Sequence, residues 1–267
     1  MGYKKLLSDT DNSDLSSFPS VQRYNAGMKQ ITEHIYCMDS NPETDQPFVY
    51  YIRGTRYSLQ IDAGNSKENY ERFLTELNKE SLPLPALMIL THWHWDHSFG
   101  VHASRCPVVS SVETDQILER ISGWEWSEEA MKRRLETGED ILFTYECMKK
   151  QYPDLGNICV KRADITFTGK MIFNLGDITC IAEHRDSPHT RDAVFIYLPE
   201  EKILIGGDAH YEDYYDNNSQ YDREKLSAFI DYLDAMDFKT YLKGHDEPEI
   251  SKKELLVLLN GKLAELP

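Results

Sequence analysis

The sequence predicts a single α/β sandwich with an inserted helical segment. Two observations carry this prediction. Short runs rich in β-branched and aromatic residues, typical of strands, alternate with stretches whose apolar residues recur at helical spacing. The chain also has 267 residues, of which 40% are hydrophobic, and this is enough for one substantial core. Interleaved strands and helices are typical of sheets that carry helices on their faces.

The first part of the chain is expected to be a lead-in over residues 1–28, followed by one domain over residues 29–267. Residues 8–20 are rich in Ser and Asp, a composition typical of poorly ordered segments. Three strand-like runs follow, namely QITEHIYCM, FVYYIR and RYSLQID. Ser66 is a suitable N-cap for the next helix, whose apolar face is formed by Tyr70, Phe73, Leu74 and Leu77.

The middle of the chain combines buried strands with a helical block. The run ALMILT is apolar without alternation, which is typical of a strand buried on both faces, and PVVSS suggests another strand. We expect a helical insertion at about residues 112–156, where polar sequence is punctuated by apolar residues such as Trp124, Trp126 and Met131. The insertion lies between two blocks of candidate metal ligands.

The last part returns to strands and ends with a helix, a strand and a helix. Five strand-like runs come first: ITFTG, MIFNL, ITCIAEH, AVFIYL and KILIGG. A helix is expected over about residues 222–236, with Leu226, Phe229, Ile230 and Leu233 on one face. After the short strand KTYLKG, the pair Ser251 and Glu254 forms a capping-box pattern that predicts the start of a final helix.

Charge and cysteine content restrict the partners and the location. The formal net charge is -16, and a field of that sign repels phosphate backbones, so we expect no nucleic-acid partner. Five widely spaced cysteines without a CxxC pair indicate neither a disulfide framework nor a zinc ribbon. The N-terminus lacks the apolar core of a signal peptide, and no apolar run approaches the ~20 residues that span a bilayer. We expect a cytoplasmic protein that is a monomer or a homodimer. We also expect it to act on a small-molecule substrate and to have no membrane partner.

The strongest local signal is the segment HWHWDH, which follows the buried strand ALMILT. Three imidazoles and one carboxylate occur within six residues, although the whole chain has only nine histidines. In an extended segment, side chains two residues apart point the same way, so His92 and His94 can share one metal ion. Asp96 and His97 follow where the chain is expected to turn, and they can face a second ion nearby. Neutral imidazole and carboxylate are the usual ligands of catalytic zinc.

The motif HWHWDH resembles the HxHxDH signature of the metallo-β-lactamase superfamily. Four further motifs occur in the order of that superfamily, IDAG, SPHT, GGDA and KGHD, and they supply Asp62, His189, Asp208 and His245. The resemblance covers roughly residues 30–248. It implies a four-layer αββα sandwich, in which two mixed β-sheets are flanked by helices.

The resemblance also implies a complete ligand set for two divalent metal ions, of the kind found in glyoxalase II and the acyl-homoserine lactonases. Three imidazoles are expected on the first ion, from His92, His94 and His189. The second ion is expected to bind Asp96, His97 and His245, with Asp208 shared between the two. Zinc suits such ligands best, and iron or manganese could occupy the same positions. Asp62 matches a structural carboxylate that the family keeps near the site.

Residues that differ from those of individual branches of the family restrict the reactions that we expect. A class of β-lactamases has Cys where this chain has Asp208, and flavodiiron relatives have Glu where it has His94. We therefore expect neither penicillin hydrolysis nor oxygen reduction. Glyoxalase II has a C-terminal helical domain for glutathione, whereas few residues follow His245 here. Pro188 replaces the Gly that many members place before the third-block histidine, which leaves the ligand unchanged.

Tyr211 is a further candidate catalytic residue. It lies three residues after Asp208, which resembles the Asp-Ala-x-Tyr motif of acyl-homoserine lactonases, whose tyrosine contacts the substrate carbonyl. A phenol at this position can donate a hydrogen bond to an oxyanion. The alternative is a packing tyrosine in a tyrosine-rich loop, because Tyr214 and Tyr215 follow. For Asp186 and Asp192, which flank His189, the default expectation is a solvated surface position, and orientation of an imidazole is the alternative.

We expect a dinuclear hydrolase whose bridging hydroxide attacks the carbonyl of a small ester, thioester or lactone. Asp96 would orient the hydroxide as well as bind metal, and Asp208 or a water would return the proton to the leaving group. The first alternative is a phosphodiesterase on the same site, which Lys or Arg at the pocket mouth would favour. The others are an iron-dependent redox enzyme of the persulfide-dioxygenase type and a non-catalytic metal-binding module.

Overall fold

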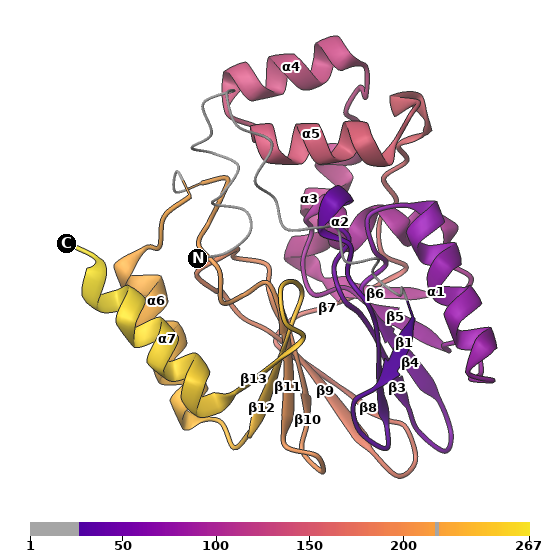
Figure 1. The fold of residues 1–267 in the computed structure, drawn as a ribbon, viewed down its shortest axis with the longest axis vertical. Coiled ribbons are helices and arrows are strands. Elements are labelled where there is room, and N and C mark those ends of the chain that lie inside the picture. Colours follow the sequence, from indigo (N-terminus) through magenta and orange to yellow (C-terminus); the bar gives the residue numbers. More distant parts are fainter. Residues whose placement is uncertain (1–26, 217–218) are drawn as a thin grey trace, which may run out of the picture.

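Two β-sheets pack face to face and helices cover their outer faces in the computed structural model, which describes residues 27–216 and 219–267 (Figure 1). Within those residues, the first sheet has seven strands in sequence order: β1 (Met28–Gln30), β2 (Ile35–Met38), β3 (Val49–Arg53), β4 (Ser58–Ile61), β5 (Leu87–Ile89), β6 (Val108–Ser111) and β7 (Ile165–Phe167). Neighbours from β1 to β4 are antiparallel and those from β4 to β7 are parallel.

The second sheet, within the same described residues, has six strands in the order β13 (Glu249–Ser251), β12 (Thr240–Lys243), β11 (Ile203–Gly207), β10 (Val194–Leu198), β9 (Thr179–His184) and β8 (Lys170–Asn174). Only β11 and β12 are parallel, and the other pairs are antiparallel. The chain passes from the first sheet to the second between β7 and β8, where Gly169 has a φ of 67° that favours glycine. Both sheets are therefore mixed, as predicted.

The core between the sheets consists of apolar side chains that alternate along the strands. Ile52 and Ile61 of the first sheet belong to one buried cluster with Ile196 and Ile205 of the second. Strand side chains point alternately to the two faces, so the intervening residues form the outer cores under the helices. The four-layer αββα sandwich is thus confirmed.

The outer faces are covered by helices on each side. Helix α1 (Lys67–Lys79) packs Phe73 and Leu77 against Tyr51 of the first sheet. Helices α6 (Arg223–Ala235) and α7 (Lys252–Glu265) cover the second sheet, where Phe229 belongs to a cluster with Phe195. The predicted caps of α1 and α7 are confirmed. The Ser66 hydroxyl accepts from the backbone N–H of Asn69, and Ser251 forms a capping box with Glu254.

The predicted helical stretch contains α3 (Val112–Ser122), α4 (Glu128–Thr137) and α5 (Leu142–Gln151), followed by the 3-10 helix η4 (Leu155–Asn157). Figure 1 shows α4 and α5 stacked beyond α3 at one end of the molecule. The division into a lead-in and one domain stays a prediction, and most of the lead-in, residues 1–26, lies outside the described residues. The run QITEHIYCM is a hairpin of β1 and β2 rather than one strand.

Short elements complete the chain and lie close to the ligand loops. They are η2 (Pro42–Thr44), α2 (Trp95–Ser98) and η3 (Phe99–Ala103). The five cysteines, all of them described, form no disulfide. In the described part of the chain, no helix has the length and apolar character to cross a bilayer.

Candidate metal centre

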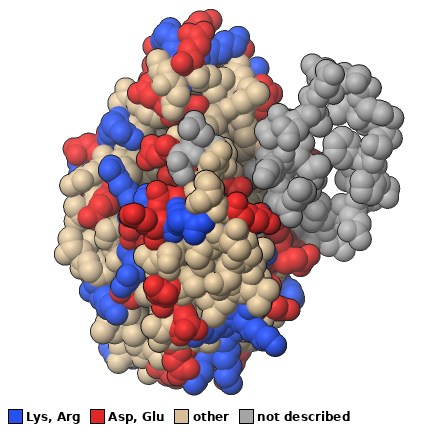
Figure 2. Space-filling view, turned by 90° about the vertical axis from the view of Figure 1, so that its left-hand side faces the viewer, with Lys and Arg blue, Asp and Glu red and all other residues tan. Residues whose placement is uncertain are grey.

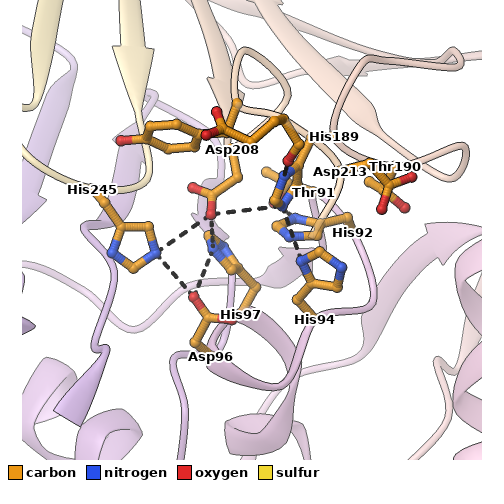
Figure 3. A network of polar contacts seen from close by, with 12 residues as sticks. Thr91, His92, His94, Asp96, His97, His189, Thr190, Asp208, Asp213 and His245 are labelled. Carbon is orange, nitrogen blue, oxygen red and sulfur yellow. Dashed lines mark hydrogen bonds and ion pairs between the residues drawn. The ribbon is translucent and has the colours of Figure 1, made fainter. Parts of the chain in front are cut away.

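Loops at the ends of strands from both sheets converge at one edge of the sandwich (Figure 3). The segment between β5 and η3 supplies four side chains, and the connections after β9, β11 and β12 supply one each. All seven are buried, with exposed fractions of at most 8%: His92, His94, Asp96, His97, His189, Asp208 and His245. These are the seven residues that the sequence singles out, and the structure brings all of them together.

The first ligand set consists of His92, His94 and His189, each of which offers one nitrogen within 4.8 Å of the others. The Nδ1 of His94 lies 3.0 Å from the Nε2 of His189. The ring centroid of His92 lies 4.5 Å from that of His94 and 5.3 Å from that of His189. Three imidazole nitrogens thus point toward one another, an arrangement suited to a single divalent cation.

The second ligand set consists of Asp96, His97, Asp208 and His245, whose ligand atoms also lie within 4.8 Å of one another. The Oδ2 of Asp96 lies 2.9 Å from the Nε2 of His245 and 3.3 Å from the Nε2 of His97. The Oδ2 of Asp208 lies 3.6 Å from the Nε2 of His97 and 3.5 Å from the Nε2 of His245. Two carboxylates and two imidazoles therefore surround one point.

Asp208 joins the two sets. Its Oδ2 belongs to the second set, yet it also lies 3.9 Å from the Nε2 of His189 in the first set. A shared carboxylate has to reach both sets in this way, so the geometry suits the bridging role that the sequence predicts for Asp208. The dashed contacts in Figure 3 run continuously from His245 through Asp208 to His189 and His94.

The ring nitrogens on the far side of three imidazoles are held by neighbouring groups. The Nδ1 of His97 lies 2.7 Å from the Oδ2 of Asp62, and the Nδ1 of His92 lies 3.0 Å from the hydroxyl of Thr91, which donates to Asp62. The Nδ1–H of His189 donates to the backbone carbonyl of Glu212 at 2.8 Å. Such contacts fix the tautomer and the ring orientation, so the Nε2 atoms are left to act as ligands. The prediction that Asp62 lies beside the site is confirmed.

The residues fit a pair of cations. The Nε2 of His92 is buried and has no hydrogen-bond partner among the described residues, although it points at the other imidazoles. Burial, together with the imidazoles of His97, His94 and His189, holds the pKa of His92 well below its usual range. A neutral imidazole with a buried lone pair is the form that binds a metal ion.

The second set attracts positive charge more strongly than the first. Burial lowers the pKa of His97, but the carboxylates of Asp96, Asp62 and Asp208 outweigh this effect and hold the pKa well above its usual value. The same negative field that attracts a proton to His97 attracts a divalent cation. The chemistry of the donor set thus agrees with its geometry.

Asp192 is buried rather than solvated, which corrects the default expectation for this residue. Its exposed fraction is 0%, and its carboxylate accepts from the backbone N–H of Trp93 at 2.9 Å. It also accepts from the hydroxyls of Thr114, at 2.8 Å, and Thr190. Asp192 therefore ties the loop that carries His92 and His94 to the loop that carries His189. Asp186, by contrast, is exposed as expected, 3.7 Å from the Nζ of Lys225.

The hydroxyl of Tyr211 donates to the Oδ2 of Asp246 at 2.6 Å, and its ring lies 6.3 Å from that of His189. A contact between this hydroxyl and substrate stays a prediction. Tyr215, which the sequence marks only as part of a tyrosine-rich loop, lies closer to the first set. Its ring centroid is 4.9 Å from that of His94 and 5.2 Å from that of Trp93.

A cavity of about 320 Å³ opens beside the first set and is lined by His94 and His189. Its apolar walls include Trp93, Trp124 and Tyr215, and Arg120 and Arg191 also line it. Trp95, which also lies between ligand residues in the chain, is 2% exposed in the core under the first sheet and does not line the cavity. The sequence does not predict that these two arginines lie in one cavity, because α3 and the loop after His189 are far apart in the chain and come together only in the folded protein.

The four remaining histidines lie outside both ligand sets. They are His34, His102, His184 and His210. Figure 2 shows Lys and Arg interspersed with Asp and Glu on one face of the molecule, without a continuous basic patch among the described residues drawn there. The expected absence of a nucleic-acid partner stays a prediction.

A sandwich of two mixed sheets with His and Asp clusters at one edge defines a class of α/β proteins suited to binding metals. The chain belongs to the metallo-beta-lactamase superfamily, whose family model matches residues 42–245.

Solved structures share the fold. A metallo-beta-lactamase from Pontibacter korlensis aligns with a TM-score of 0.63 at 20% identity, over 90% of this chain and 99% of that one. The metallo-beta-lactamase FIM-1 from Pseudomonas aeruginosa, in its mono-zinc form, aligns with a TM-score of 0.58 at 14% identity, over 90% and 96%. A double mutant of the sec-alkyl sulfatase PisA1 aligns with a TM-score of 0.59 at 16% identity, over 90% of this chain but only 41% of that one.

Proposed function

We propose that this protein is a dinuclear metal-dependent hydrolase that acts on the ester, thioester or lactone bond of a small molecule. One observation carries the proposal. Seven buried ligand side chains form two adjoining sets, and one of these sets opens onto a cavity large enough for a small substrate. Structural relatives described as β-lactamases and a sulfatase are consistent with hydrolysis on this fold.

The two sets would hold two divalent cations, for which zinc is the first choice because imidazole and carboxylate suit it. When bound, such a pair supplies Lewis acidity and makes a water molecule acidic near neutral pH. His94 and His189 line the cavity, so a substrate carbonyl bound there would lie next to the first set. No residue of the second set lines this cavity among the described residues.

The protein's own carboxylates then transfer a proton from the attacking water to the leaving group. Hydrolysis adds water to the carbonyl carbon and breaks its bond to the leaving oxygen or sulfur, which yields a carboxylic acid and an alcohol or thiol. The carboxylate of Asp96 orients the attacking water. Asp208, which reaches both sets, accepts the proton that the water loses and returns it to the leaving group. The aromatic walls of the cavity exclude bulk water from these groups.

A phosphodiesterase is the second candidate, and the positions of Arg120 and Arg191 favour it. Both line the cavity beside the first set, where a guanidinium group can pair with a phosphate oxygen. The same metal ligands serve either reaction, so the substrate bond has to be determined by assay.

The test combines metal analysis with a substrate panel. Purified protein is analysed for its metal content and is then assayed with para-nitrophenyl acetate, a thioester, a lactone and bis(para-nitrophenyl) phosphate. In the Asp208→Ala protein we expect turnover to fall by more than about 100-fold, because the loss of a ligand exceeds the ~10–100-fold cost of losing its outer partners. Bound metal should fall as well.

Asp231→Ala is the matched control, because it removes an exposed carboxylate from α6. This variant should retain both metal and turnover. Unchanged turnover in the Asp208→Ala protein would contradict the proposed role of Asp208, and preferential cleavage of the phosphodiester would favour the second candidate.

A further inference from the structure

The cavity beside the first ligand set has a rigid aromatic side. Trp93 lies between two ligand histidines in the chain, and its backbone N–H is held by the buried carboxylate of Asp192. Trp124 is held from behind by Arg134, whose guanidinium lies 4.5 Å from the Trp124 ring centroid and 4.7 Å from that of Trp126. Pre-positioned rings of this kind bind planar apolar groups without losing much conformational freedom.

Two guanidinium groups face the same cavity from separate elements. Arg120 comes from α3, and Arg191 comes from the loop that carries His189. Neither forms an ion pair with another residue in the described part of the chain. Both side chains are exposed, so an anion that enters the cavity from solvent can reach them.

Three carboxylates also line the cavity, those of Glu139, Asp213 and Asp216, and the first two accept hydrogen bonds from neighbouring groups. The Oδ1 of Asp213 accepts from the backbone N–H groups of Tyr215, at 3.0 Å, and Asp216, at 2.8 Å. Glu139 accepts from the hydroxyl of Thr137 at 2.9 Å. None of the three forms an ion pair with Arg120 or Arg191 among the described residues, so both guanidinium groups can pair with an incoming anion, which cations in the metal centre would also attract.

We propose that the substrate carries an anionic group, set apart from the bond that is cleaved, on an aromatic or similarly flat apolar frame. The anion would pair with Arg120 and Arg191 while the frame lies between the aromatic walls. This inference rests on the proposed ester-hydrolase function, because it assigns the part of the substrate that does not react. It does not depend on which metal occupies the ligand sets.

Three para-nitrophenyl benzoates test the proposal, because they differ only in the para substituent of the acid: carboxylate, methyl or aminomethyl. We expect kcat/KM of the metal-loaded protein to be about 10-fold higher for the carboxylate ester than for the methyl ester, which is the effect of about one charge-assisted hydrogen bond. Arg120→Gln and Arg191→Gln should remove most of this preference, mainly through KM. Arg133→Gln, an exposed arginine of α4 outside the cavity, is the matched control.

A binding measurement separates failure of this inference from failure of the proposed function. Terephthalate has two carboxylates, whereas para-toluate has one carboxylate and a methyl group in place of the second. Isothermal titration should show tighter binding of terephthalate, and the advantage should disappear in the Arg191→Gln protein. If no ester is hydrolysed but this advantage is present, the proposed function fails and the anion site stands. Equal or better use of the methyl or aminomethyl ester, with no terephthalate advantage, would overturn the inference while ester hydrolysis stands.

Discussion

The two ligand sets differ in charge and in access. The first consists of three imidazoles, whereas the second contains the carboxylates of Asp96 and Asp208. Of the described residues that line the cavity, His94 and His189 belong to the first set and none belongs to the second. The field at the second set raises the pKa of His97, whereas burial and neighbouring imidazoles lower that of His92.

The difference indicates that the two neighbouring sites have different roles, one in holding a cation tightly and the other in meeting the substrate. A cation in the second set would be neutralised by two carboxylates, so it should be held more tightly. A cation in the first set would keep most of its charge and would lie next to the cavity that His94 and His189 line. The supporting carboxylates differ as well, because Asp62 reaches a ligand of each set, whereas Asp192 holds only the loops around the first. Removing these supports one at a time tests the comparison.

The largest effect is expected for Asp62→Asn. Asp62 holds the Nδ1 of His97 and the hydroxyl of Thr91, which contacts His92, so its charge supports both sets. Asn tolerates the left-handed backbone found here, where φ is 65°, so the fold should survive. We expect a loss of about 100-fold in turnover, the upper end for an outer partner of a metal ligand, and a weaker affinity for both cations. Competition with a chelator measures the affinity, and normal metal retention would contradict the assignment.

A smaller and more selective effect is expected for Asp192→Asn. This carboxylate touches no imidazole among the described hydrogen bonds, but it holds the loops on either side of the first set. We expect about a 10-fold loss of affinity at the first set, with the second set retained, because the change acts through loop position. Titration of the apoprotein with cobalt should show one normal and one weakened site. Asp186→Asn, on the exposed neighbour, should leave both sites unchanged, and equal weakening of both sites would refute the division.

The smallest effect is expected at His34, a histidine outside both sets. Its Nδ1 lies 2.7 Å from Glu201, and its Nε2 lies 3.5 Å from Asp177. Burial lowers its pKa, but the carboxylates of Glu201 and Asp177 outweigh burial and raise it above 6.5. The folded state therefore binds the proton more tightly than the unfolded state does. The resulting stability is fully present below pH 6.5 and is lost as pH rises through the folded pKa.

Chemical unfolding of metal-free protein, compared with the His34→Gln variant across this range, measures the effect. We expect a difference of no more than about 1 kcal/mol in the free energy of unfolding, because the pair is partly open to water. The difference should be larger on the acid side of pH 6.5. A pH-independent difference would show that protonation of His34 contributes nothing.

The sequence predicts the ligands better than it predicts their surroundings. All seven follow strand-like runs, and the order of their motifs is enough to bring them together. Asp192 could not be recognised, because its partners Trp93, Thr114 and Thr190 come from three separate segments and its burial depends on all of them. The position of Arg120 and Arg191 in one cavity could not be predicted for the same reason. Side chains that act through long-range packing leave no local pattern, whereas ligands that share one short turn do.

Both sheets contribute to each ligand set, and this has a consequence for assembly. The segment after β5 belongs to the first sheet, while His189, Asp208 and His245 follow strands of the second. Neither half of the sandwich alone carries a complete set, so high-affinity cation binding has to wait until the halves have joined. Bound ions would then link the two halves, and the free energy of unfolding should rise with the concentration of free metal.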